Sequence, residues 1–169
     1  KTNSDIYVIL TPSGYHYKNI LEISKKSKNI IVEKPLVINY EQGKKINIYA
    51  NKKKLNLFVV KQNRYNLGIK LLKEAIVSGR FGKIFFASIR LRWKRDDMYF
   101  KSGKWRGSWK DDGGVLANQA SHHLDLIHWL IGDVKSVFTK TAKINNITKA
   151  ADTMAAIIKF KNEAIGTIE

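Results

Sequence analysis

Short apolar runs alternate with helical periodicity along the first third of the chain. Ile6–Leu10 and Ile30–Val32 are rich in β-branched residues and predict strands buried on both faces of a sheet, and Leu55–Val60 predicts a third strand. Between them, apolar spacing predicts amphipathic helices over Tyr15–Lys26 and Val37–Asn51. Strand–helix–strand units of this length are right-handed and parallel. The pattern therefore predicts the C-terminal half of a doubly wound (Rossmann) sheet.

The pattern changes after Tyr65. Ile69–Val77 predicts a helix, and Ile84–Trp93 alternates polar with apolar residues, as in a half-exposed antiparallel strand. A helix is predicted within Gly113–Gly132, and further strands over Val134–Ile144, Thr153–Phe160 and Ala164–Glu169. The fold class is therefore α/β: a partial dinucleotide-binding domain over residues 1–63 and part of an α+β domain, with a mostly antiparallel open sheet, over residues 64–169.

The glycine-rich turn G-x-G-x-x-G that normally opens a dinucleotide-binding sheet is absent from the sequence. The first predicted strand would leave an unpaired parallel edge, which natural proteins avoid. We therefore expect the chain to be a middle fragment of a longer protein. By itself it should bind a dinucleotide weakly or not at all.

Composition narrows the class of protein. An apolar content of 44% is ordinary for a globular protein, and no apolar run is long enough to span a bilayer. No secretory signal is present. The chain has no cysteine, which excludes disulfides and thiolate metal sites. We expect a cytoplasmic protein without a metal.

The formal net charge of +17 raises the possibility of a basic, non-catalytic nucleic-acid-binding module. Runs such as Lys52–Lys54 fall on or at the ends of predicted surface helices, and none of the known signatures of base-reading or base-stacking modules appears. We therefore expect no nucleic-acid partner. Tight, steeply salt-dependent binding to duplex or single strand would favour that alternative instead. A basic surface also attracts anionic cofactors and nucleotide sugars.

Two stretches carry candidate chemistry. In the helix that follows the glycine pair, Asn118, His122 and Asp125 are spaced i, i+4 and i+7, so they share one face. A polar stripe facing solvent is the alternative. Lys34 lies in Glu33-Lys34-Pro35, directly after the second strand, where doubly wound sheets bind ligands. A surface lysine is equally compatible with that position alone.

Together these motifs resemble the glucose-fructose oxidoreductase/inositol dehydrogenase (Gfo/Idh/MocA) family of NAD(P)-dependent sugar and cyclitol dehydrogenases. The resemblance implies that Lys34 lies beside the nicotinamide and the reacting hydroxyl. Oxidation of a hydroxyl needs a proton acceptor, and a desolvated lysine or a histidine can serve. We expect His122 to be the acceptor and Lys34 to hold the substrate oxygen, with the reverse assignment open. Asn118 stands where many members have aspartate, which puts an Asp-assisted mechanism in doubt.

The resemblance also implies two sets of ligand-binding residues. The cofactor, NAD with NADP not excluded, would contact Thr11, Pro12, Ser13, His16, Glu33, Lys34, Pro35, Gln62, Trp105 and Arg106. The substrate would contact Lys34, Asn63, Arg64, Tyr65, Asn118, His122 and Asp125. Arg64 fits a domain-linking salt bridge equally well, Asp125 fits local packing, and Trp105 with Trp109 fits a small core.

The segments K-Q-N-R-Y, W-R-G-x-W and N-Q-A-S-H-H-x-D look like those of the UDP-N-acetyl-2-amino-2-deoxyglucuronate dehydrogenases of surface-polysaccharide biosynthesis. That likeness implies NAD-dependent oxidation of the sugar's 3-hydroxyl. Another sugar or cyclitol dehydrogenase of the family, or a catalytically inactive relative, is the alternative. We expect a homo-oligomer, dimer or tetramer, formed through the open face of the second sheet, including Ile89 and Leu91.

Overall fold

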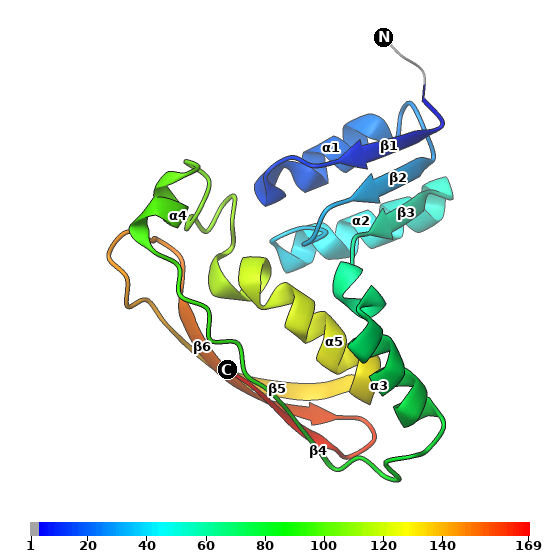
Figure 1. Cartoon of the computed structure of the whole chain (residues 1–169). Helices are drawn as coiled ribbons and strands as arrows, with labels where there is room; N and C mark the ends of the chain where they lie inside the picture. Colours follow the sequence, from blue (N-terminus) through cyan, green and yellow to red (C-terminus); the bar gives the residue numbers. More distant parts are fainter. Residues whose placement is uncertain (1–3) are drawn as a thin grey trace.

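The computed structural model describes residues 4–169 and confirms a parallel sheet in the first part of the chain (Figure 1). Strands β1 (Ile6–Ile9), β2 (Asn29–Val32) and β3 (Asn56–Val59) pair in parallel in the order β1-β2-β3. Helices α1 (His16–Ile23) and α2 (Tyr40–Lys53) connect them. The carboxyl ends of the three strands therefore meet at one edge of the sheet.

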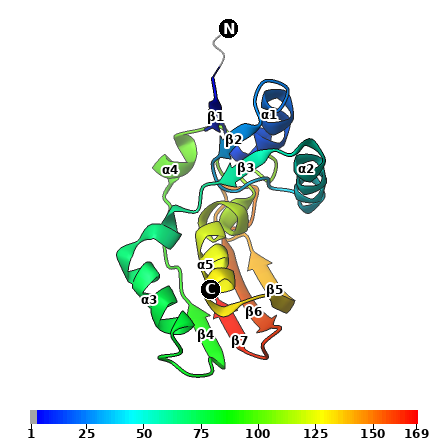
Figure 2. The ribbon, with the colours of Figure 1, turned by 90° about the vertical axis from the view of Figure 1, so that its right-hand side faces the viewer.

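Both connecting helices lie on the same side of this sheet (Figure 2). The core on that side is formed by Ile9, Ile20, Ile30, Val32 and Ile46. On the opposite side Ile6, Val8 and Phe58 are 55%, 53% and 62% exposed. The prediction that β1 is buried on both faces is therefore wrong. Alternate side chains of a strand point to opposite faces, and only one face of this sheet is covered by α1 and α2.

Helix α2 begins later than its apolar spacing predicted. The side chain of Asn39 accepts hydrogen bonds from the backbone N–H groups of Glu41 and Gln42, so the helix begins after this cap. It ends at Lys54, which has a left-handed backbone with φ of 54°. Helix α1 is likewise preceded by a short 3-10 turn, η1 (Ser13–Tyr15). The Asn39 cap, rather than the apolar periodicity, sets the beginning of α2.

The second part of the chain builds a four-stranded sheet in the order β4-β7-β6-β5. The turn η2 (Gln62–Tyr65) and helix α3 (Leu67–Val77) lead into it. Its strands are β4 (Phe86–Ile89), β5 (Val134–Ala142), β6 (Thr153–Phe160) and β7 (Ile165–Ile168). The pair β4–β7 is parallel and the other two pairs are antiparallel. The prediction of an antiparallel strand over Ile84–Trp93 is therefore wrong, because alternating polar and apolar residues show that one face is exposed but not the direction of the neighbouring strand. Helix α5 (Ser121–Ile131) covers one face, and α4 (Asp97–Lys101) lies in the loop beyond β4 (Figures 1 and 2).

The two faces of the second sheet differ in burial. Ile127 of α5 packs with Ile158 and Phe160 of β6 in the core, and Ile89 packs against this cluster. The expectation that Ile89 belongs to the open face is therefore wrong, and Leu91 lines a cavity rather than that face. The residues exposed on the outer face are Phe86, Phe138, Ile157 and Ile165.

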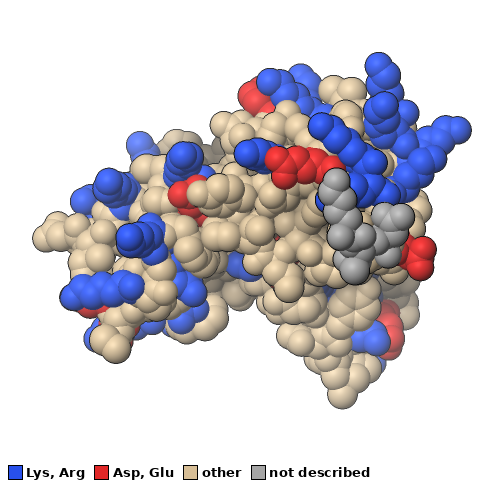
Figure 3. Space-filling view, turned by 90° about the horizontal axis from the view of Figure 1, so that it is seen from above, with Lys and Arg blue, Asp and Glu red and all other residues tan. Residues whose placement is uncertain are grey.

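Lysine and arginine side chains stand over both the left-hand and right-hand parts of the face seen in Figure 3. On this face the positive charge is therefore not gathered into a single patch. Among residues 4–169, no helix is long and apolar enough to cross a membrane.

Candidate active site

Lys34 connects the two parts of the chain. It follows β2, and its ammonium donates to the backbone oxygen of Asn118 at 2.7 Å and to the side-chain oxygen Oδ1 of Asn118 at 3.0 Å. The Lys34 side chain is half-buried, and burial lowers its pKa from the ordinary lysine value. The sequence motif at the sheet edge and the motif before α5 therefore meet in one place.

A buried carboxylate lies behind Asn118. Asp112 is only 2% exposed, and its Oδ2 accepts a 2.8 Å hydrogen bond from the backbone N–H of Gly107. Its Oδ1 accepts from the amide nitrogen of Asn118. Because a carboxylate only accepts, it fixes the Asn118 amide with its nitrogen toward Asp112 and its oxygen toward Lys34. Burial raises the pKa of Asp112, and the hydrogen bonds from Gly107 and Asn118 oppose that rise.

Asp112 was missed by the sequence analysis. It precedes the glycine pair, but nothing in its spacing connects it with Lys34, which is distant in sequence. Its position depends on the loop that folds back so that Gly107 can donate to it.

The helix predicted after the glycine pair is not continuous. A π-helical turn, η3 (Val115–Gln119), comes first, and α5 follows it. Gly113 and Gly114 have φ of +74° and +70°, and a Cβ on Gly114 would lie 2.6 Å from the backbone oxygen of Ala151. The glycine pair therefore permits this close approach. The π turn places Asn118 against Lys34, and π turns are frequent at functional sites.

His122 lies in the first turn of α5, close enough to Lys34 to feel its charge. Its pKa is lowered from the ordinary histidine value, first by burial and then by the nearby positive charges of Lys34 and Lys61. Its Nδ1 is buried and has no hydrogen-bond partner in the described part of the chain. A lowered pKa keeps the imidazole neutral near pH 7, which is the form that accepts a proton.

Asp125 is occupied by an ion pair between the two parts of the chain. Arg64 of η2 donates to both carboxylate oxygens of Asp125 at 2.7 Å, and Lys61 lies 3.6 Å from one of them. The Arg64 guanidinium also lies 5.2 Å from the centroid of the Trp129 ring. Of the two predicted roles of Arg64, the geometry matches the domain-linking salt bridge. This bidentate pair holds η2 against α5 beside His122.

Of the residues predicted to line the cofactor at the ends of β1 and β2, some are accessible to a ligand and others are buried in the protein. Thr11 is exposed, Pro12 is half-buried, and Glu33 accepts from the Lys34 backbone N–H at 3.0 Å. His16 is fully buried, with one ring nitrogen 2.7 Å from the backbone oxygen of Pro35 and the other 2.9 Å from that of Thr11. His16 therefore joins the ends of the two strands and has both nitrogens engaged. Ser13 is also buried.

The remaining residues predicted to bind cofactor or substrate lie in η2 and in the loop before η3, and their side chains differ in solvent exposure. Gln62 and Tyr65 of η2 are exposed, and Asn63 is half-buried. The guanidinium carbon of Arg106 lies 4.6 Å from the ring centroid of Trp105. The charge of Arg106 contributes to lowering the pKa of Lys34, so the loop carrying Arg106 reaches the site. The structure thus brings Lys34, Asn118 and His122 together, and places Asp125 in a supporting ion pair.

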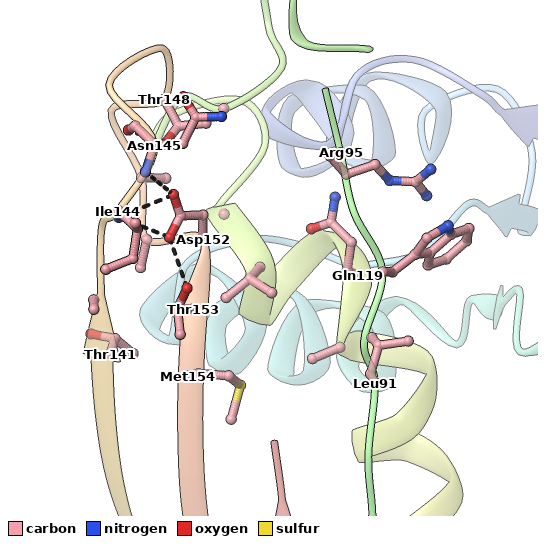
Figure 4. Close-up of a pocket in the computed structure, with 18 of the residues that line it drawn as sticks. Leu91, Arg95, Gln119, Thr141, Ile144, Asn145, Thr148, Asp152, Thr153 and Met154 are labelled. Atoms are coloured by element: carbon pink, nitrogen blue, oxygen red, sulfur yellow. Dashed lines mark hydrogen bonds between the residues drawn. The ribbon is translucent and has the colours of Figure 1, made fainter. Parts of the chain in front are cut away.

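A cavity of about 930 Å³ lies behind this site, between the loop after β4 and the ends of β5 and β6. Its lining includes Asp112 and Gln119, but neither Lys34 nor His122. Figure 4 shows Asp152 on one wall, held by hydrogen bonds from Ile144, Asn145 and Thr153. The cavity therefore adjoins the candidate site from the side of the buried Asp112.

The exposed edge at β1 to β3 suits one end of a nicotinamide dinucleotide. Thr11 and the half-buried Pro12 and Lys34 lie at the carboxyl ends of β1 and β2, where doubly wound sheets bind such ligands. The sequence has no glycine-rich phosphate turn. The described residues therefore fit the reacting end of the cofactor and supply no such cradle for its diphosphate.

Comparisons with known proteins point in the same direction. The model of the GFO/IDH/MocA C-terminal domain matches residues 69–169, and the model of an oxidoreductase family with an NAD-binding Rossmann fold matches residues 1–61. Myo-inositol 2-dehydrogenase of Thermotoga maritima is 26% identical over 172 residues, covering 99% of this chain and 49% of that protein.

Among solved structures, the WlbA dehydrogenase of Bordetella pertussis, in complex with NADH and UDP-GlcNAcA, is 38% identical with a TM-score of 0.94. The match covers 99% of this chain and 51% of that one. The WlbA dehydrogenase of Chromobacterium violaceum, also with NADH and UDP-GlcNAcA, is 39% identical with a TM-score of 0.94, covering 99% and 49%. The chain thus spans about half the length of these relatives.

Replacing Asp112 with asparagine should destabilise the fold. An amide at this position turns an N–H toward either Gly107 or Asn118, so one buried donor loses its acceptor, at a cost of about 1–3 kcal/mol. Urea unfolding at pH 7 measures the change. Asp111→Asn removes the same charge one residue away, outside this hydrogen-bonded chain, and serves as the control. Equal stability of the two variants would contradict a special role for Asp112.

Proposed function

Because the chain belongs to the GFO/IDH/MocA family of oxidoreductases, with its NAD-binding Rossmann fold, we propose that its residues carry out the NAD-dependent oxidation of a nucleotide-sugar hydroxyl. The substrate is the 3-hydroxyl of a UDP-N-acetylglucosaminuronic acid, as a step in surface-polysaccharide biosynthesis. The observation that carries the proposal is the meeting of Lys34, Asn118 and His122 across the two parts of the chain.

The choice of a nucleotide sugar is supported by the degree of likeness. The two WlbA dehydrogenases, whose structures contain NADH and UDP-GlcNAcA, are 38% and 39% identical to this chain. The curated inositol dehydrogenase is 26% identical. A net charge of +17 also favours ligands that carry several negative charges. The higher identity and the positive charge both favour the UDP-sugar acid over a neutral cyclitol.

In the proposed reaction the proton of the 3-hydroxyl passes to His122, and hydride leaves the carbon that bears this hydroxyl. The imidazole is suited to this role because burial and the charges of Lys34 and Lys61 lower its pKa and keep it neutral near pH 7. NAD, when bound, supplies the acceptor for the hydride. The products are a 3-keto sugar, NADH and the proton carried by the imidazole, so electrons and protons balance.

Lys34 holds the oxygen of the reacting hydroxyl. Two of its donors are directed to Asn118 at 2.7 and 3.0 Å, which fixes the ammonium and leaves a third donor for the substrate. A donor at this oxygen stabilises negative charge that develops as the proton leaves. Asn118 cannot take a proton, so it positions Lys34 rather than acting as an acid or base.

The direct test is NADH formation. The full-length protein that contains this chain is incubated with NAD and, in separate reactions, with a UDP-N-acetylglucosaminuronic acid or with free myo-inositol, while the absorbance of NADH is followed. We expect turnover with the UDP-sugar acid only. Turnover with the free cyclitol alone would overturn the substrate assignment and keep the family activity.

The variants Lys34→Ala and His122→Ala should each lower kcat by about 10²–10⁴-fold, as expected for loss of acid–base groups. His128→Ala is the control, because His128 lies on the same helix and its side chain is 55% exposed. Circular dichroism checks that each variant is folded. Near-normal turnover in either folded variant would refute the role of that residue.

The pH dependence separates the two proton acceptors. If His122 accepts the proton, kcat/KM falls as pH decreases through its pKa, which lies below the ordinary value of 6.5. Lys61→Gln removes a positive charge that lowers this pKa, so the acid limb should move to higher pH. Lys70→Gln, on α3, is the matched control. An acid limb in the alkaline range would instead identify Lys34 as the acceptor.

We also propose that the protein self-associates through the outer face of the second sheet. Phe138 of β5 and Ile157 of β6 are cross-strand partners, 64% and 55% exposed. Phe86 and Ile165, paired between β4 and β7, are 52% and 43% exposed. Neighbouring exposed apolar side chains on several strands are typical of a protein interface.

Light scattering coupled to size exclusion tests this interface. We expect a dimer or tetramer for the protein and a smaller species for Phe138→Glu, because a charge in an apolar interface is costly to desolvate. Tyr40→Glu, at an exposed aromatic site on α2 (79% exposed), should leave the mass unchanged. A monomeric parent protein, or an unchanged mass in Phe138→Glu, would overturn the proposal.

A further inference from the structure

Two arginines in the loop between β4 and η3 are stacked with aromatic rings in an alternating series. The guanidinium of Arg95 lies 3.7 Å from the ring centroid of Trp93 and 4.4 Å from that of Tyr99. The guanidinium of Arg106 lies 4.3 Å from the same Tyr99 ring and 4.6 Å from that of Trp105. We call these five residues the arginine stack. Stacking fixes the planes of the guanidinium groups and leaves their edges as hydrogen-bond donors.

Neither arginine forms a salt bridge in the described part of the chain, although the charge of Arg106 acts on the Asp112 carboxylate and lowers its pKa. The Nε atoms of Arg95 and Arg106 are buried and have no hydrogen-bond acceptor among residues 4–169. The neighbouring arginines differ, since Arg90 and Arg92 both lie within hydrogen-bond distance of Glu169, at 3.0 and 3.2 Å. Arg95, a partly desolvated cation with no salt bridge among the described residues, favours an anion at its remaining donors, the terminal nitrogens.

The carboxylates nearby are already satisfied by the protein. Asp112 accepts from Gly107 and Asn118. Asp152 accepts backbone and hydroxyl hydrogen bonds on the opposite wall of the adjoining cavity, and Figure 4 shows the Arg95 guanidinium extending away from that wall. The spare charge in this region is therefore positive, and it belongs to the arginine stack.

The stack reaches the candidate active site at one end. The charge of Arg106 lowers the pKa of Lys34, so Arg106 is the nearer member. Tyr99, between the two arginines, accepts a 3.4 Å hydrogen bond from Gln119, the residue after Asn118. Arg95 and Trp93 continue the stack beyond Tyr99. An anionic ligand with its reacting carbon at Lys34 would therefore have a second, charged part along the stack.

We propose that the arginine stack binds the diphosphate of a nucleotide sugar, with Arg95 as a substrate-specificity residue. This inference rests on the proposed function and names how that site selects its substrate. In a nucleotide sugar the diphosphate is attached to the anomeric carbon C1, two ring positions from the carbon that bears the 3-hydroxyl. Two guanidinium groups in one stack match the two phosphates, whereas a single sugar carboxylate needs one cation.

Binding of defined probes to the protein tests the proposal by calorimetry. UDP carries the diphosphate without the sugar, N-acetylglucosaminuronic acid carries the carboxylate without the diphosphate, and NADH carries the other diphosphate that this family handles. Arg95→Ala should weaken UDP binding about 10- to 100-fold, as for lost hydrogen bonds to a charged group. Binding of the free sugar acid and of NADH should not change.

Two further variants keep the result interpretable. Arg95→Lys retains the charge without the planar fork, so it should recover only part of the lost affinity. Arg80→Ala removes the same charge from an exposed position after α3 and should bind UDP like the parent protein. Unchanged UDP binding in folded Arg95→Ala, an equal loss in Arg80→Ala, or a loss confined to the free sugar acid or NADH would overturn the diphosphate assignment.

Failure of this inference and failure of the proposed function are distinguishable. If NADH forms from the UDP-sugar acid with the same KM in Arg95→Ala, the arginine stack is not the diphosphate site and the dehydrogenase activity stands. If the protein oxidises a different sugar but loses UDP affinity in Arg95→Ala, the diphosphate site stands and the choice of reaction fails.

Discussion

The contact between the Lys34 ammonium and Asn118 is the interaction on which the candidate site depends. It joins the edge of the first sheet to the turn before α5, across 84 residues of sequence. Lys34 loses solvent on becoming half-buried, and two oxygens of one residue replace part of its hydration. Because Asp112 fixes the Asn118 amide from behind, the lysine is held by a hydrogen-bonded chain that begins in the core.

Around this contact some charged side chains form ion pairs within residues 4–169 and others, including Lys34, do not. Asp125 takes the charges of Arg64 and Lys61, so the strongest ion pair stabilises the junction between the two parts of the chain. At His122 the positive charges of Lys34 and Lys61 act more strongly than the negative charge of Glu33. Such an environment favours the neutral imidazole, and it favours anionic ligands. In the proposed reaction the same arrangement serves both proton transfer and substrate selection.

Much of the fold was predictable from the sequence. The parallel order of the first three strands, β6 at its predicted ends, and the helix ending at Val77 all follow from apolar periodicity and turn residues. The burial of β1 was not predictable, because Ile6 and Val8 are apolar whichever elements cover them. Likewise, the alternation of polar and apolar residues in β4 indicates that the strand has two different faces, but it does not indicate which face packs against α5. Ile89 was therefore predicted on the wrong face.

The site was predictable only as far as local motifs reach. Lys34 and His122 belong to motifs whose spacing indicates chemistry, and in the structure the charge of Lys34 is close enough to lower the pKa of His122. Asp112 and Arg95 have no such signal. The role of Asp112 depends on a loop returning Gly107 to it, and that of Arg95 on two aromatic rings that enclose its guanidinium. Both are tertiary arrangements, which no spacing in one sequence reveals.

The asparagine at position 118 has a physical explanation in this arrangement. A carboxylate there would lie beside the buried Asp112 carboxylate, and two such groups in contact cannot both be ionised without strong repulsion. The amide avoids that repulsion, since its nitrogen donates to Asp112 and its oxygen accepts from Lys34. The negative charge of Asp112 is thus separated from Lys34 by the Asn118 amide. Lys34 is held by a neutral group, which leaves the ammonium less neutralised and more available to an electron-rich substrate oxygen.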